Sequence, residues 1–157
     1  MSAFTGTLCL LEVIPGKRWR IFDTLVWEVG SEGSGVRIEI PAGFETDGAT
    51  IPAALRLVLA VWGSYGRAAA LHDYLYSIIR EGRLWNGAGE PHPAFAAWDA
   101  ASFDAGTGWQ ASARRWADQQ FYEAMLACGT SRPLALIMWA AVRALGGWAI
   151  ERDRAKA

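Results

Sequence analysis

The residues best suited to chemistry in this sequence are His72 and Asp73, two adjacent ionisable side chains within a run of alanines, leucines and tyrosines. The good helix formers around them predict a helix over residues 65–80. On that helix His72 and Tyr76 share one face, whereas Asp73 points about 100° away around the axis. Leu75 belongs to a third stripe that can be buried. We therefore expect a polar edge on a helix that is anchored to the core.

A second predicted helix, residues 109–128, supplies the candidate partner Asp118. Large apolar residues on that helix suggest that this carboxylate is buried, and a buried carboxylate needs a partner. His72, Arg114 and Arg115 are the candidates for that partner. The tyrosine hydroxyls of the first helix could also join the network.

Three chemical roles are open to His72. It could be a general base whose far ring nitrogen is held by a carboxylate, a metal ligand beside Asp73 or Asp47, or a structural histidine bonded to Asp118. The sequence has too few histidines and no thiolate pair for a zinc site. Asp73, Asp47 and loop carbonyls suit an oxygen-ligated ion such as calcium better. The residues alone leave a catalytic dyad and a structural network both open.

Composition limits the function classes. The 157 residues are 52% hydrophobic and 20% charged, which predicts one folded domain over residues 1–157. The net charge of −1 gives no electrostatic footprint for nucleic acid. The start of the sequence lacks the pattern of a signal peptide. Residues 133–150 are apolar but are interrupted by Arg143 and a glycine pair, so we expect a buried helix, no transmembrane span and a soluble protein.

Tryptophan and cysteine add two expectations. Nine tryptophans are spread along the chain, which predicts a tryptophan-rich core and rim, with a partner surface as the alternative use. Cys9 and Cys128 are too few for a disulfide framework, so both are expected to be buried free thiols. His92 lies between two prolines in a loop and is expected to be solvated.

Strand patterns come first in the chain and helix patterns later, which predicts an α+β fold. We expect a small antiparallel N-terminal sheet packed against three to four helices. The predicted strands are residues 7–13, 19–23, 25–29 and 36–40, within a β-rich part over residues 1–52. The predicted helices are residues 53–61, 65–80, 109–128 and 133–145, within a helical part over residues 53–150, with a short helix and loop over 94–108. Residues 41–52 are expected to form turns and residues 151–157 a frayed tail.

Four blocks of sequence carry a resemblance to a known family: Pro41–Pro52, Tyr65–Tyr76, Arg115–Phe121 and Ala141–Gly146. Taken in this order, they resemble an uncharacterised phage and prophage family, the domain-of-unknown-function family 1353. The resemblance implies an origin in a phage, prophage or phage-derived particle, and it implies no activity. The partners expected from it are other phage particle proteins or further copies of the chain, in the host cytoplasm during assembly or in the virion.

A second, local resemblance rests on residues 72–76, which are similar to the helix motif of secreted phospholipases A2. It implies that His72 is the base, Asp73 a calcium ligand and Tyr76 a supporting residue. Asp118 would be the orienting carboxylate, an assignment made by role. Leu75 stands where that family has a framework cysteine, and the calcium-loop motif is absent unless the turn over residues 43–50 replaces it. The implied substrate is an envelope lipid.

Two hypotheses follow. In the first, the chain is a non-catalytic phage- or prophage-derived particle or assembly protein, in which a buried His–Asp network joins the helices and a tryptophan-rich surface binds partners. In the second, it is a small calcium-dependent hydrolase of the cell envelope that uses His72, Asp118 and Tyr76, with Asp73 and Asp47 as metal ligands.

Overall fold

A computed structural model describes residues 1–14, 18–46, 65–85, 87–98 and 108–154. The predicted helix over residues 53–61 and the candidate ligand Asp47 lie outside these ranges. The element order is six strands, then the helix α1, a short 3-10 helix and the helices α2 and α3. The predicted α+β fold, with antiparallel strands first and helices later, is confirmed.

The strands form two small sheets, not the single sheet that was expected. The first has the order β1-β4-β5 and consists of Ala3–Thr5, Leu25–Glu28 and Arg37–Ile40. The second has the order β2-β3-β6 and consists of Leu10–Ile14, Arg18–Ile21 and Glu45–Thr46. All pairs are antiparallel. β6 was expected to be a turn; it is a strand because Glu45 and Thr46 pair with Arg20 and Trp19, far away in the sequence.

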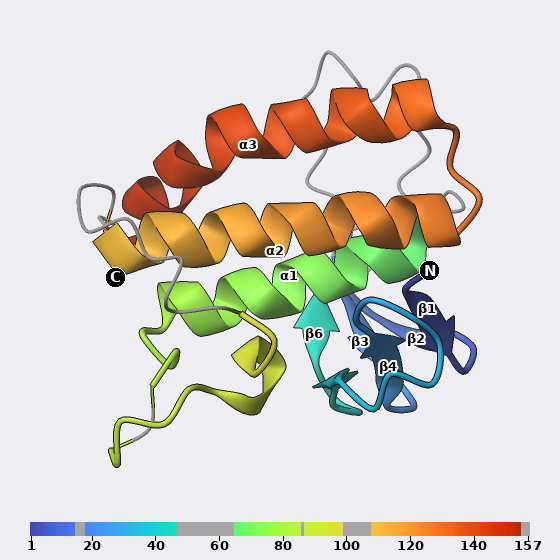
Figure 1. Cartoon of the computed structure of the whole chain (residues 1–157), viewed down its shortest axis with the longest axis horizontal. Coiled ribbons are helices and arrows are strands. Elements are labelled where there is room, and N and C mark those ends of the chain that lie inside the picture. The colour runs from blue at the N-terminus through green and yellow to red at the C-terminus, as the bar shows by residue number, and fades with distance from the viewer. Residues whose placement is uncertain (15–17, 47–64, 86, 99–107, 155–157) are drawn as a thin grey trace.

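Three helices stack side by side: α1 (Gly66–Arg80), α2 (Gly108–Ala127) and α3 (Arg132–Arg154). Successive helices run in opposite directions, and α2 lies between α1 and α3 (Figure 1). The strands lie on the side of α1 that faces away from α3. α1 therefore contacts both the strands and α2, and side chains on it can reach either layer.

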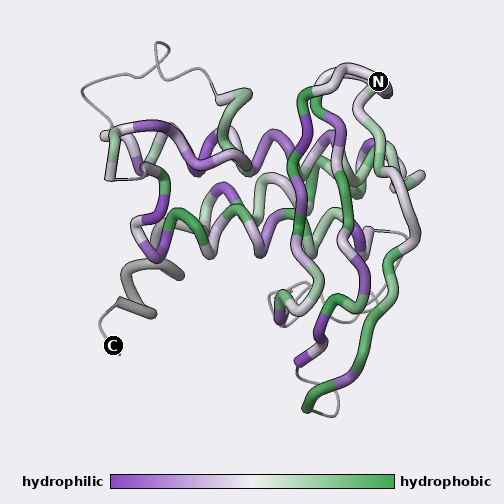
Figure 2. The backbone as a smooth tube through the Cα atoms, turned by 90° about the horizontal axis from the view of Figure 1, so that it is seen from below, coloured by the Kyte–Doolittle hydropathy of each residue, from purple (hydrophilic) through white to green (hydrophobic). Residues whose placement is uncertain are grey.

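Apolar side chains from all these elements form the core. Along the helices, hydrophobic stretches alternate with hydrophilic ones (Figure 2), as expected of helices with one buried face. Trp27 on β4 is fully buried, and its indole Nε1 donates a hydrogen bond of 3.0 Å to Gln120 Oε1 on α2. This bond satisfies the polar atom of a large buried ring and joins the first sheet to α2.

The last helix is longer than expected. It was predicted to end near Gly146 and Gly147, yet α3 continues to Arg154. A glycine in a helix costs only about 1 kcal/mol relative to alanine, and the residues that follow are good helix formers. Among the described residues, no helix is long and apolar enough to cross a membrane.

Several local expectations need correction. Cys9 is exposed and Cys128 only partly buried, so the cysteines are not a buried pair; burial still raises the pKa of the Cys128 thiol. Where a short helix over 94–108 was expected, the described part holds the 3-10 helix Pro93–Phe95. His92 was expected to be solvated but is half-buried, and its Nδ1 accepts the backbone N–H of Ala94 at 3.1 Å. Burial lowers the pKa of His92.

The tryptophans that the structure describes with their side chains belong mostly to the core and its rim, as predicted. Trp27 and Trp98 are buried, and Trp85 is 40% exposed. The partly buried tryptophans are Trp19, Trp109, Trp116 and Trp139.

Candidate functional site

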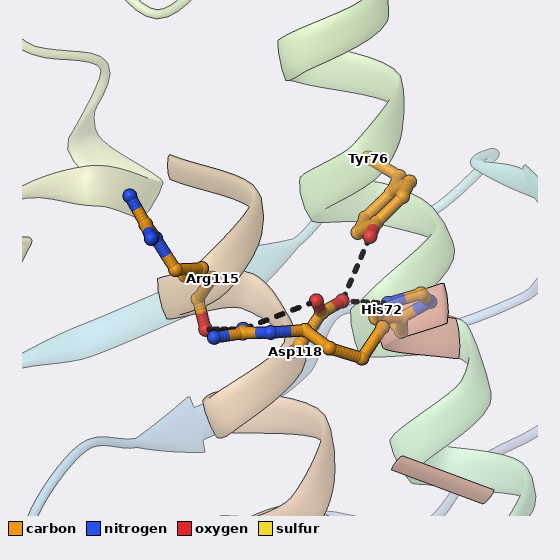
Figure 3. A network of polar contacts seen from close by, with 5 residues as sticks. His72, Tyr76, Arg115 and Asp118 are labelled. Atoms are coloured by element: carbon orange, nitrogen blue, oxygen red, sulfur yellow. Dashed lines mark hydrogen bonds and ion pairs between the residues drawn. The ribbon is translucent and has the colours of Figure 1, made fainter. Parts of the chain in front are cut away.

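The site lies where α1 and α2 cross. His72 Nε2 on α1 is 3.1 Å from Asp118 Oδ1 on α2, and the Tyr76 hydroxyl donates to the same oxygen at 2.7 Å (Figure 3). The Asp118 side chain is 2% exposed and the His72 side chain 12%. The predicted group of His72, Asp118 and Tyr76 is therefore brought together around one buried carboxylate.

Small residues allow this close approach. The fully buried alanines of α1 and α2, among them Ala68, Ala113, Ala117 and Ala124, contribute only a methyl group each to the core. Leu71, Leu75 and Ile78, also fully buried, anchor α1 in the core. Because the anchoring side chains and the polar side chains lie on different faces of one helix, packing fixes the position of the polar edge.

The His72 ring is held by two aromatic neighbours. Its centroid is 4.2 Å from that of Tyr76 and 4.8 Å from that of Phe121. An ionised carboxylate only accepts hydrogen bonds, so the contact with Asp118 places a proton on Nε2 of the neutral imidazole. Nδ1 then carries the free lone pair. Nδ1 makes no hydrogen bond with any residue that the structure describes.

Tyr76 is a stable donor in this network. Burial, followed by the nearby charge of Asp118, raises the pKa of the Tyr76 phenol far above its usual value of 10.0. The hydroxyl therefore stays protonated at neutral pH, and it keeps donating to Asp118.

The second oxygen of Asp118 has a partner that the sequence did not suggest. Arg143 on α3 places Nη1 3.4 Å from Asp118 Oδ2 and donates to the carbonyl of Arg115 at 3.2 Å. The expected arginine partners Arg114 and Arg115 therefore do not supply the ion pair; Arg115 contributes its backbone oxygen instead (Figure 3). The feature that could have indicated this ion pair is that Arg143 is the one charged residue in the apolar stretch 133–150, because a charge needs a partner when such a helix packs.

Asp73 faces the strands rather than the dyad. Its Oδ2 accepts a hydrogen bond from the hydroxyl of Thr46 on β6. Calcium takes about six to eight oxygen ligands. Among the described residues no group of three or more histidine, cysteine or acidic side chains is arranged to hold a metal. The predicted metal ligand Asp73 is therefore placed beside β6, and the second predicted ligand, Asp47, lies outside the described residues.

Tyr74 was a second candidate for the network, but it serves another part of the protein. Its ring packs edge-on against Phe44 at 5.3 Å and lies 6.4 Å from the His92 ring. Burial raises the pKa of Tyr74. Tyr74 thus joins α1 to the strand side, and the described contacts place Tyr76 alone of the two beside Asp118.

Fold and site together define an α+β protein in which two antiparallel helices share a buried histidine–aspartate–tyrosine group. The family model described as "Protein of unknown function (DUF1353)" matches residues 19–142. The chain belongs to this family. The matched span includes His72, Tyr76 and Asp118 and ends one residue before Arg143. No curated protein and no solved structure matches the chain.

Proposed function

We propose that this protein is a hydrolase of carboxylic esters in which His72 is the general base. The observation that carries the proposal is the 3.1 Å contact between His72 Nε2 and Asp118 Oδ1, on a ring whose Nδ1 has no partner among the described residues. One ring nitrogen is thereby oriented and the other left able to accept a proton. A histidine that served only to join helices would stabilise the fold more if both of its ring nitrogens made hydrogen bonds.

The reaction has two steps. As a water oxygen bonds to the ester carbonyl carbon, Nδ1 of His72 accepts a proton from that water and the carbonyl π electrons move to oxygen. The tetrahedral intermediate then collapses, the bond to the alcohol oxygen breaks, and His72 returns the proton to the leaving oxygen. Asp118 remains ionised and stabilises the imidazolium that forms between the two steps. A positioned base of this kind contributes about 10²–10⁴-fold.

The likeness to secreted phospholipases A2 supports an ester of an envelope lipid as the substrate. His72, Tyr76 and Asp118 stand in the relation that this likeness implies, with the tyrosine hydroxyl on the orienting carboxylate at 2.7 Å. Leu75, at the place of the framework cysteine, is fully buried, so apolar packing takes over the anchoring of the helix. Asp73 and Asp47 are the proposed ligands for calcium, which when bound would stabilise negative charge on the ester oxygen.

The test is ester hydrolysis by the wild-type chain and by two histidine variants. Long-chain p-nitrophenyl esters and phospholipid vesicles serve as substrates, each with millimolar calcium or with chelator. We expect His72→Gln to abolish turnover and His92→Gln to keep it, because His92 caps a 3-10 helix and its ring lies near Tyr74, which is outside the Asp118 network. Equal turnover by His72→Gln and wild type, or no turnover by wild type on any of these substrates, would overturn the proposal.

A second candidate is a non-catalytic role in a phage- or prophage-derived particle, in the host cytoplasm during assembly or in the virion. The observation that favours it is that Asp118 joins α1, α2 and α3 through His72, Tyr76 and Arg143. Leu136 and Ile137, each about half exposed on α3, and Trp85 are candidates for contact with other particle proteins or a second copy. Sedimentation of wild type and Ile137→Lys tests self-association; an unchanged monomer in both would remove that part of the role.

A further inference from the structure

Arg143 is the residue of the site that neither resemblance assigns a role. It lies on α3, the helix that packs on the far side of α2 from α1, and its side chain is 34% exposed. Its guanidinium reaches Asp118 from the side opposite to His72, because Nη1 contacts Oδ2 at 3.4 Å whereas His72 and Tyr76 both contact Oδ1. The two oxygens of Asp118 are therefore held by different helices.

The guanidinium is itself fixed at three points. Besides Asp118 Oδ2, Nη1 contacts the Arg115 carbonyl at 3.2 Å, and the guanidinium carbon lies 5.4 Å from the ring centroid of Trp139, one helical turn earlier on α3. Trp139 in turn packs edge-on against Tyr122 on α2. A cation above an aromatic face at this distance is attracted to it. Arg143 is thus pre-oriented before it meets the carboxylate.

We infer that Arg143 is a positioning residue for the proposed hydrolysis: by holding Oδ2 it fixes the plane of the Asp118 carboxylate so that Oδ1 faces His72. The inference rests on the proposed function, and it adds a third helix to the machinery. Arg143 does not touch the substrate, because Asp118 lies between it and His72. Its effect reaches the reaction through the tautomer and orientation of the imidazole.

An arginine suits this position better than a lysine. Nη1 of the guanidinium contacts both the Arg115 carbonyl and the Asp118 carboxylate while the planar group lies near the indole ring of Trp139. The ammonium of lysine keeps the charge but has no planar face to lie against the indole. We therefore expect Arg143→Lys to recover only part of the function that Arg143→Gln loses.

The experiment is nitrogen–proton correlation NMR of the imidazole rings, combined with steady-state kinetics. The chain has only two histidines, so the His72 signals can be assigned with the His92→Gln variant. In wild type we expect one neutral tautomer of His72, protonated at Nε2. In Arg143→Gln we expect a mixture of tautomers and a fall in kcat of about tenfold to a hundredfold with KM unchanged. Arg143→Lys should lie between the two.

Arg132→Gln is the matched control, because Arg132 is an exposed arginine at the first position of the same helix. The His92 signals report whether each variant is folded. A wild-type His72 spectrum and unchanged kcat in Arg143→Gln would overturn the inference, as would an equal effect of Arg132→Gln. Absence of turnover in wild type overturns the proposed function alone, since the tautomer of His72 still reports whether Arg143 positions Asp118.

Discussion

Asp118 is the residue on which the whole site depends. It is a carboxylate with 2% side-chain exposure, and it is compensated by an imidazole, a phenol and a guanidinium. A buried carboxylate with this many partners is compatible with a stable fold. Loss of one partner leaves the carboxylate incompletely compensated and lowers the stability of the fold. The partners differ in kind: Tyr76 and Arg143 donate to the carboxylate and stay protonated, whereas the other ring nitrogen of His72 can accept a proton.

Tyr76 gives a prediction at the scale of the residue. Its pKa is raised in the folded state, so its contribution to stability is complete below the unfolded value of about 10 and is lost as the pH rises above that value. We expect Tyr76→Phe to lower the free energy of unfolding by about 1–3 kcal/mol at neutral pH. The loss of stability above pH 10 should also be shallower than in wild type. Urea unfolding from pH 7 to 11 measures both.

Tyr74→Phe is the control for this prediction, because Tyr74 lies on the same helix without joining the Asp118 network. Equal stabilities of Tyr76→Phe and wild type at pH 7 would mean that the 2.7 Å hydrogen bond contributes nothing.

At the scale of the element, the site needs α1 and α2 to be close. Ala117 precedes Asp118 and is fully buried. We expect Ala117→Leu to destabilise the fold by about 1–3 kcal/mol through overpacking and to separate His72 from Asp118. Turnover should therefore fall together with the Nε2-protonated signal of His72. Ala140→Leu, an exposed substitution on α3, is the control. Full activity and an unchanged His72 signal in Ala117→Leu would show that the helix spacing is not what positions the dyad.

The elements also show which parts of the fold can be predicted from the sequence. The helices α1 and α2 could be predicted to within one or two residues, since alanine-rich helical periodicity is local. A buried carboxylate's need for a partner made His72 one of three candidates for contact with Asp118, beside Arg114 and Arg115. The end of α3 was missed because a glycine pair weakens a helix without stopping it. The split into two sheets and the strand Glu45–Thr46 depend on pairing between distant residues, which no local pattern encodes.

Arg143 was missed for the same physical reason. In the sequence it served only as an argument against a membrane span, because nothing local indicates that α3 packs back on α2 with that side chain over Asp118. Asp73 shows the reverse case. Its neighbour in sequence is the dyad histidine, yet it accepts a hydrogen bond from Thr46 on a strand.

At the scale of the whole molecule, α1 stands between two layers that carry different parts of the proposed site. His72 contacts Asp118 on α2, and Asp73 accepts a hydrogen bond from Thr46 on β6. In the proposed site, a cation bound by Asp73 would lie near His72 and would not displace the hydrogen-bond partners of Asp118. The family match covers both sides of this arrangement.

Calcium binding gives the prediction at this scale. A ligand that binds only the folded state stabilises it by about 2.7 kcal/mol at a hundredfold excess over Kd. We expect millimolar calcium to raise the Tm of wild type above its value in chelator, and the rise to vanish in Asp73→Asn. Magnesium and the variant Asp23→Asn, a surface carboxylate, are the controls. A flat response to calcium would remove the metal from the proposal and leave the His72 dyad to be tested alone.

The most direct test of the central claim is to measure turnover and the free energy of unfolding together on Asp118→Asn. The amide keeps the shape of the carboxylate but stabilises neither the correct tautomer nor the imidazolium of His72. The catalytic account predicts that kcat falls about 10⁴-fold, as when the orienting aspartate of a catalytic triad becomes asparagine. The variant should stay folded, with Tyr76 and Arg143 still packed around the amide. A variant that loses stability but keeps wild-type turnover would contradict the account and leave the network a structural joint between helices.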